Sequence, residues 1–238
     1  MPAREVAYSA DGADMLGFLA TPDGGGRGPA VLVAHEAPGL TDHCRDVARR
    51  LAALGYVAFA LDYHGGGRPL PIEEAQPRLR AWIADPAGIR RRAQAALDVL
   101  LAEPGVDPAR VAAAGYCYGG NVSLELARTG AALAAVAGFH PGLATTRQAE
   151  SLNIKAQVLM MIGAEDPLVT PEQIQDFQRE MTAAGVDWRL ILYGGAPHSF
   201  TNPDAAVFGI PGLAYHAETD RRSWRAMLDL FAETIGAP

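Results

Sequence analysis

The sequence of 238 residues has only two cysteines, Cys44 and Cys117, and they do not form a Cys-x-x-Cys pair. A disulfide framework or a zinc ribbon would need more cysteines at closer spacing, so neither is expected. No run of 18 apolar residues occurs, and the first residues lack the apolar stretch of a secretion signal. These absences predict a cytoplasmic protein with no membrane partner.

Positive charge is also scarce in this chain. Lys and Arg number 20 against 27 Asp and Glu, so the formal net charge is −7. A protein that grips nucleic acid needs a basic surface for the phosphate backbone, so no nucleic-acid partner is expected. With 49% hydrophobic residues and no visible linker or internal repeat, residues 1–238 are predicted to form a single domain, as a monomer or a homodimer.

Short apolar runs alternate with stretches of helical period along the whole sequence. This alternation is typical of βαβ units, which build a mostly parallel sheet covered by helices on both faces. The expected strands are residues 15–20, 30–35, 56–61, 111–116, 134–139, 158–162 and 189–193. The predicted fold class is therefore α/β, with a doubly wound sheet and no separate lid domain.

Helix signals fall between these strands. Apolar residues recur at helical spacing within residues 44–54, 93–101 and 224–235. A further helix is expected to begin after Thr170, because Gln173 completes a capping box and Pro171 suits the first turn.

Segments rich in glycine or proline interrupt this pattern. Residues 24–26 are three glycines and are expected to form a strand-to-strand turn. Residues 63–86 lack strong periodicity and are predicted to border the entrance of a pocket. Within them, His64 to Pro69 is glycine-rich but lacks the spacing of a phosphate-binding loop, so no nucleotide cofactor is expected.

The most informative stretch is Gly-x-Cys-x-Gly-Gly at residues 115–120. A strand of small residues precedes it and a helix-compatible sequence follows, so Cys117 is predicted to lie on a sharp strand-to-helix turn. Gly115 and Gly119 are expected there because the strained turn leaves no room for Cβ atoms. A thiol at a helix N-terminus is also favoured in its anionic form. The alternative for Cys117 is a buried structural thiol, which is the interpretation preferred for Cys44 within an apolar helix stripe.

A nucleophile needs a base, and the base needs a group that orients it. Asp166 and His198 each follow an expected strand, and the chain order Cys117, Asp166, His198 is that of α/β-hydrolases. Glu165 competes with Asp166, and a surface histidine is the alternative for His198.

The loop after residues 30–35 is expected to complete the site. In this fold that loop supplies one amide of an oxyanion hole, and the residue after the nucleophile supplies the other. Ala37 and Tyr118 are assigned these amides, and Glu36 would lie over the site. A loop carboxylate that caps the next helix is the alternative for Glu36. His35-Glu36 opens a zinc motif, but position 39 is glycine, so no metal is expected.

On these residues the sequence resembles the dienelactone hydrolase (carboxymethylenebutenolidase-like) family over nearly its whole length. The resemblance implies an α/β-hydrolase fold, a Cys-His-Asp triad at Cys117, His198 and Asp166, and no cofactor. It also implies that Glu36 contacts the resting cysteine and accepts a hydrogen bond from its neutral thiol until substrate displaces the carboxylate.

One position departs from the family pattern. The enzyme that names the family holds a substrate carboxylate with arginines, one of them four residues after the catalytic histidine, and this chain has Asn202 there. Arg78, Arg80 and Arg90 lie in the region of the other arginine without a secure match. A neutral ester, lactone or thioester is therefore as compatible with the sequence as dienelactone.

The sequence thus predicts a small-molecule hydrolase of esters or lactones. Tyr116, His140 and Asn202 are predicted to border its substrate pocket. A thioesterase or general carboxylesterase using the same triad is the alternative within enzymes. A redox sensor built on Cys117 and a catalytically silent binding protein on the same fold are the alternatives outside hydrolysis.

Overall fold

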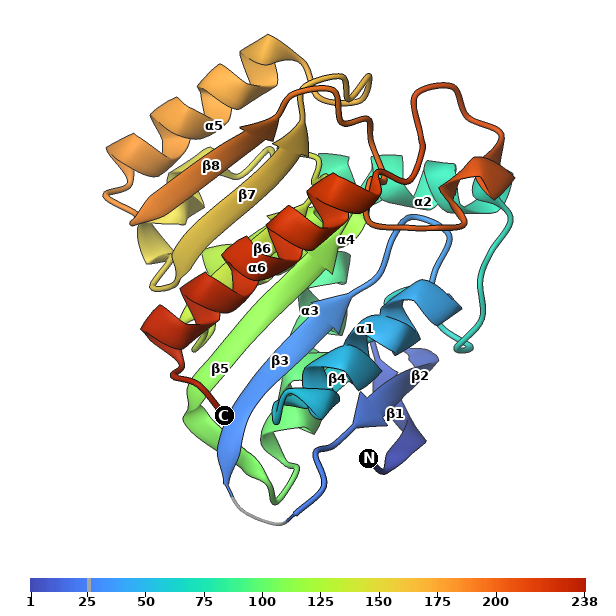
Figure 1. Cartoon of the computed structure of the whole chain (residues 1–238), viewed down its shortest axis with the longest axis vertical. Helices are drawn as coiled ribbons and strands as arrows, with labels where there is room; N and C mark the ends of the chain where they lie inside the picture. Colours follow the sequence, from blue (N-terminus) through green and yellow to red (C-terminus); the bar gives the residue numbers. More distant parts are fainter. Residues whose placement is uncertain (25–26) are drawn as a thin grey trace.

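The computed structural model describes residues 1–24 and 27–238, which are arranged around one eight-stranded sheet (Figure 1). Residues 25 and 26 of the predicted glycine turn lie outside the described residues. The strands are β1 (Ala3–Ala10), β2 (Ala13–Ala20), β3 (Gly28–Ala34), β4 (Val57–Ala60), β5 (Val106–Tyr116), β6 (Ala135–Phe139), β7 (Gln157–Gly163) and β8 (Trp188–Tyr193).

The strands lie side by side in the order β1-β2-β4-β3-β5-β6-β7-β8. β1 pairs with β2 and β2 with β4 in antiparallel fashion, whereas every pairing from β4 to β8 is parallel. The mostly parallel sheet predicted from the alternating pattern is confirmed. Parallel strands end at one common edge, and the residues that follow β3, β5, β7 and β8 therefore gather there.

Helices cover both faces of this sheet. They are α1 (Asp42–Ala53), α2 (Ile72–Ala84), α3 (Ala87–Leu101), α4 (Tyr118–Arg128), α5 (Pro171–Ala183) and α6 (Ala217–Thr234), with short 3₁₀ helices η1 (Gln148–Asn153) and η2 (Ala205–Phe208). In Figure 1, α1 and α6 lie in front of the sheet, while α3 and α4 lie behind it. No helix among the described residues is both long enough and apolar enough to span a membrane.

Alternate residues of the strands divide the apolar interior into two cores. Leu32 of β3 packs in the core beneath α3, α4 and α5, whereas its neighbours Val31 and Val33 pack in the core beneath α1 and α6. Successive strand side chains point to opposite faces, so a strand covered on both sides is apolar throughout. This explains why the inner strands are continuous apolar runs in the sequence.

Local signals mark the ends of two helices. Thr170 and Gln173 form the capping box of α5, and Pro171 occupies its first position. Gly55 takes a positive φ of 99° after α1. Such a backbone conformation carries a steric penalty for any residue with a Cβ, which is the reason for glycine there.

One strand and one α-helix were not predicted. β1 is an edge strand with mostly exposed or half-buried residues, so it lacks the apolar run that marks the inner strands. α2 falls in the segment expected to be irregular, because it carries Pro77 in its interior and buries only Ala75 completely. A proline inside a helix removes one backbone hydrogen bond, and here tertiary contacts override that penalty.

Candidate active site

Cys117 lies between the end of β5 and the start of α4, on a strained turn. Its backbone adopts φ 52° and ψ −122°, a conformation that residues with a Cβ rarely adopt. A Cβ on Gly115 would lie 2.1 Å from the carbonyl oxygen of Gly119, and one on Gly119 would lie 2.2 Å from that of Ala34. The two glycines are therefore required by close backbone contacts, and the turn holds the half-buried Cys117 at the edge of the sheet.

His198 and Asp166 form a buried pair beside Cys117. His198 Nδ1 donates a hydrogen bond to Asp166 Oδ2 at 2.6 Å, and both residues follow strand ends as expected. The backbone N–H of Leu168 donates to the other oxygen of Asp166, which fixes the carboxylate. Glu165 takes no part in this pair. The bond from Nδ1 to Asp166 orients the ring of His198. The other ring nitrogen, Nε2, is buried and has no hydrogen-bond partner in the described part of the chain.

The environment of His198 favours its charged form. Burial opposes the charge, but the negative charge of the Cys117 thiolate and the hydrogen bond with Asp166 outweigh it and raise the pKa of His198 to about 10 once the thiol proton has been transferred. An imidazole with this proton affinity readily accepts the proton of an adjacent thiol.

Two backbone amides lie next to the thiol. Ala37 and Tyr118 both line the same cavity as Cys117. Their N–H groups donate no hydrogen bond within residues 1–24 and 27–238. His64 Nε2 donates to the carbonyl oxygen of Ala37 at 2.8 Å, and the Tyr63 hydroxyl donates to that of Glu36 at 2.9 Å. These bonds hold the backbone carbonyl groups of the loop after β3 in place.

Glu36 is buried over the site, with only 2% of its surface exposed. Its Oε2 accepts a hydrogen bond from Asn202 Nδ2 at 2.6 Å and lies 3.3 Å from His43 Nδ1. Its Oε1 is buried without a hydrogen-bond partner among the described residues. One oxygen is thus held by Asn202, while the other has no hydrogen bond to Cys117 or to any other described residue. Glu36 and Cys117 line the same cavity.

The cavity beside Cys117 has a volume of about 300 Å³ and is mainly apolar. Its apolar walls come from α2, from the loops after β6 and β7, and from the segment before α6: Ile72, Leu79, Ile83, Leu143, Leu168, Ile210 and Leu213. Among the described residues that line it there is no Lys or Arg, and Glu36 is the only acidic residue. Within residues 63–86, which were predicted to border the pocket, the residues that line it belong to α2.

Three residues predicted to border the pocket lie behind it instead. Tyr116 is 1% exposed and stacks on Phe139, at 4.6 Å between ring centroids. His140 is fully buried and hydrogen-bonds Thr201 at 2.8 Å, while Asn202 holds Glu36. None of the three lines the cavity. Tyr116 is the residue before the nucleophile, and strand alternation turns its side chain into the α1 and α6 core.

None of the three arginines considered as carboxylate ligands lines the cavity either. Arg78 and Arg80 are exposed on α2, and Arg78 donates to the carbonyl oxygen of His64 at 3.4 Å. Arg90 is bound elsewhere, by Glu125 and Glu150.

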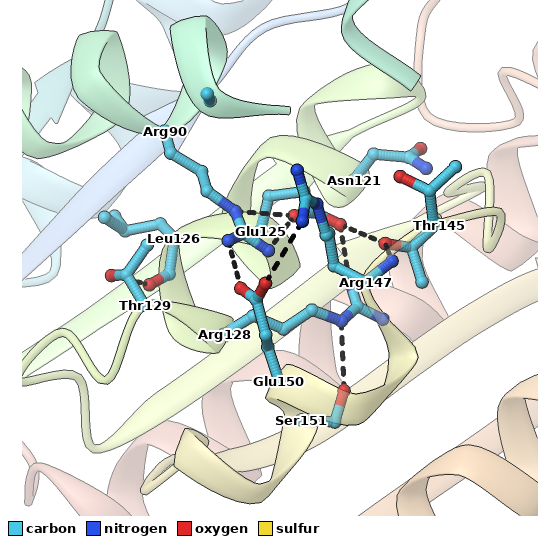
Figure 2. A network of polar contacts seen from close by, with 12 residues as sticks. Arg90, Asn121, Glu125, Leu126, Arg128, Thr129, Thr145, Arg147, Glu150 and Ser151 are labelled. Carbon is cyan, nitrogen blue, oxygen red and sulfur yellow. Dashed lines mark hydrogen bonds and ion pairs between the residues drawn. The ribbon is translucent and has the colours of Figure 1, made fainter. Parts of the chain in front are cut away.

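Arg90 belongs to a second buried polar cluster, at the far end of α4. Figure 2 shows Arg128 donating to Glu125 and Ser151, and Glu125 also accepting hydrogen bonds from Arg90 and Thr145. Glu180 of α5 accepts from Arg128 Nη2 at 2.6 Å. These contacts fasten α4, which carries Cys117 at its N-terminus, to α3, η1 and α5.

His43 is the main residue of the site that the sequence analysis missed. It lies in the first turn of α1, seven residues after Glu36, and the sequence analysis assigns it no role. Its position at a helix start that directly follows the Glu36 loop is the signal that could have singled it out. Nowhere in the described ranges do three or more His, Cys, Asp or Glu side chains form a cluster that could hold a metal ion.

Comparison with known proteins places this site in a family. Residues 15–235 match the model of the dienelactone hydrolase family. A Yersinia pestis protein provisionally named a carboxymethylenebutenolidase is 27% identical over 245 residues, covering 96% of this chain and 87% of the relative.

Solved structures agree with that match. A dienelactone hydrolase-like promiscuous phosphotriesterase from metagenomic libraries is 44% identical, covers 98% of both chains and superimposes with a TM-score of 0.95. A dienelactone hydrolase from Anabaena variabilis is 21% identical over 95% of this chain and 97% of its own, with a TM-score of 0.66, and shares the fold. The predicted α/β-hydrolase fold and the predicted hydrolase class are confirmed.

Proposed function

The chain belongs to the dienelactone hydrolase family, and from that premise we propose that it hydrolyses neutral esters or lactones with Cys117 as the nucleophile. His198 is the general base and Asp166 orients its ring. The observation that carries this proposal is the position of Cys117 on a strained turn, in one cavity with a His198 that Asp166 fixes at 2.6 Å. The continuous sheet from β1 to β8 supports a single domain.

The proposed reaction uses the groups in the order of the acyl transfer. The thiol proton passes from Cys117 to Nε2 of His198, and the thiolate attacks the acyl carbon. The amides of Ala37 and Tyr118 donate to the oxygen that becomes negative. The ester C–O bond then breaks, and the alcohol takes the proton from His198. Water, activated by His198, releases the acid and restores the thiol.

The lining of the cavity supports a neutral, apolar substrate. A substrate carboxylate would enter an apolar space with Glu36 nearby and without Lys or Arg among the described lining residues. An unpaired anion in such a place is costly, because burial removes its hydration. Asn202 stands where the family has an arginine, but its side chain carries no charge. Its amide group is already hydrogen-bonded to Glu36. A thioesterase or a general carboxylesterase would use the same groups.

Neutral phosphotriesters are a second candidate substrate class. The 44% identical relative is described as a promiscuous phosphotriesterase. A triester has no negative charge, so the apolar cavity presents no barrier to it, and the same thiolate and amides would serve an attack on phosphorus.

A substrate panel tests the proposed function. A neutral activated ester, a neutral lactone, an acyl thioester, a neutral phosphotriester and an unsaturated lactone carboxylate are each assayed with the wild type, Cys117→Ala and His198→Ala. We expect turnover of neutral substrates that both variants lose, with kcat/KM for the carboxylate lactone at least about tenfold lower. Turnover that survives in Cys117→Ala would contradict the proposed nucleophile, and a preference for the carboxylate lactone would contradict the proposed substrate class.

A further inference from the structure

The contacts of Glu36 divide its carboxylate into two unequal halves. Oε2 accepts a hydrogen bond from Asn202 and lies close to the His43 ring, whereas Oε1 has no partner in the described residues. A buried carboxylate is stable only when hydrogen bonds and an opposite charge replace its hydration. Asn202 supplies a hydrogen bond but no charge, so a cation is needed.

His43 is placed to be that cation. Its side chain is only 8% exposed, and Nδ1 lies 3.3 Å from Glu36 Oε2 as a charge contact, without hydrogen-bond alignment. Burial alone would lower the pKa of His43, but its contacts with Cys44 and Glu36 outweigh burial and raise the pKa to about 10. Burial raises the pKa of the Cys44 thiol, which stays neutral at pH 7, so Glu36 is the anion that His43 balances.

The other groups around His43 do not supply a competing positive charge. Tyr116 of β5 presents its ring edge to the imidazole at 5.0 Å between centroids. Burial lowers the pKa of His140 well below its usual range, so this ring is neutral. Asp220 of α6 is an acid, its pKa raised by burial, and it faces Arg50. Arg50 itself lies 3.8 Å from the Trp224 ring centroid.

We propose that His43 is a positioning residue that, with Asn202, fixes Glu36 by one oxygen and leaves Oε1 to receive the Cys117 S–H. This inference rests on the proposed role of Cys117 as nucleophile. The imidazolium also cancels the charge of Glu36. When the thiol proton moves to His198, the thiolate therefore forms beside a neutral pair instead of beside an unbalanced carboxylate.

The pH dependence of Cys117 alkylation tests this role without any substrate. Iodoacetamide modification is followed by intact mass from pH 5 to 10, and the fully buried Cys44 is not expected to react. In His43→Gln, the uncompensated Glu36 charge opposes the thiolate, so the profile moves to higher pH by about one unit. At a fixed pH below the midpoint, alkylation slows about tenfold.

A second background separates positioning from a general structural effect. In Glu36→Gln, His43 has lost its anion, burial keeps the ring neutral, and adding His43→Gln is expected to leave the alkylation profile unchanged. A profile that does not move in the single variant would overturn the proposal. So would an equal shift in both backgrounds, because the effect would then not pass through Glu36.

Imidazole ¹⁵N shifts provide a measurement that needs no change at His43. We expect the His43 ring to stay protonated at pH 8 in the wild type and to be neutral at the same pH in Glu36→Gln. A neutral ring in the wild type would overturn the proposal even if the His43 variant failed to fold. Loss of hydrolysis in Cys117→Ala with no His43-dependent shift would refute only the role of His43. Hydrolysis that persists in Cys117→Ala would instead refute the proposed function.

Discussion

The two ends of helix α4 carry buried polar clusters that differ in how completely their atoms are paired. At the C-terminal end, all three guanidinium nitrogens of Arg128 donate hydrogen bonds. Both oxygens of Glu125 accept hydrogen bonds, one from Arg128 and the other from Arg90 (Figure 2). Near the N-terminal end, Glu36 Oε1 and the ring nitrogens His140 Nδ1 and His198 Nε2 are buried without hydrogen-bond partners among the described residues.

This difference separates a cluster that holds the fold from one that performs chemistry. A fully paired network fixes its elements in one arrangement, and an incompletely paired one is costly to fold. Natural proteins depart from complete pairing mainly at functional sites, where substrate or a moving proton supplies the missing partner. Two of the unpaired atoms near Cys117, His198 Nε2 and Glu36 Oε1, are the groups to which we assign contact with the thiol proton.

The largest expected effect is on catalysis at the N-terminal end. We expect Cys117→Ala to lower kcat/KM for a neutral ester by about a thousandfold or more, because the nucleophile is lost, while the melting temperature changes little. Ser123→Ala is the matched control on the same helix, since it removes a buried hydroxyl whose one hydrogen bond within the described residues goes to the Gly119 carbonyl oxygen. If kcat/KM of Ser123→Ala in an esterase assay fell as far as that of Cys117→Ala, the result would contradict the catalytic role assigned to the N-terminal end.

The next largest effect is on stability at the C-terminal end. Arg128→Met leaves Glu180 buried with an unbalanced charge and removes one of the two arginines that bind Glu125, so urea denaturation should show about 3–5 kcal/mol less unfolding free energy. Below the transition, kcat should stay within a few-fold of the wild type. Arg179→Met removes an exposed ion pair of α5 with Asp176 and should cost less than about 1 kcal/mol. Equal losses in the two variants would contradict the structural role of the buried network.

Between pH 7 and 10, stability should depend on the protonation of His43 at the N-terminal end. The pKa of His43 is raised to about 10, so the native state holds on this ring a proton that the unfolded chain has lost. This stabilisation is complete below about pH 6.5 and is lost as pH rises through 10, by roughly 2–4 kcal/mol. Denaturation curves at pH 7 and 10 measure it. Glu36→Gln should flatten the loss, and an unchanged slope in that variant would refute the His43 contribution.

The smallest expected effect compares one asparagine from each region. Asn202→Ala removes a charge-assisted bond to Glu36 and should lower the unfolding free energy by about 1.5 kcal/mol. Asn153→Ala removes a neutral bond from an exposed side chain to the Arg128 carbonyl oxygen and should cost about 0.5 kcal/mol. The reverse order in thermal denaturation would contradict the account of Glu36.

The sequence predicts the parts of the site that local backbone rules determine. Gly115 and Gly119 frame Cys117 because of backbone contacts, and Asp166 and His198 follow strands whose apolar runs are easily recognised. Their assignment as a triad remains a proposal, but the structure places Cys117 and His198 on the lining of one cavity and pairs His198 with Asp166.

Contacts between distant segments could not be predicted in this way. The pairing of His43 with Glu36 and of Glu36 with Asn202 depends on the packing of α1 and of the loop after β8 against the sheet. α2 was missed because its helix persists around Pro77, and Arg128 because no local pattern announces its partner Glu180. Each of these depends on tertiary contacts, which override or lie beyond local propensity.

The most direct test of the central claim is the search for an acyl-enzyme on Cys117. Wild type, His198→Ala and Cys117→Ala are mixed with an activated acyl ester, quenched at successive times and examined by intact mass and peptide mapping. The account predicts a transient acyl adduct on Cys117 in the wild type and none on that peptide in Cys117→Ala. It also predicts slow acylation with a longer-lived adduct in His198→Ala. Hydrolysis by Cys117→Ala at the wild-type rate, or an adduct on another residue, would contradict it.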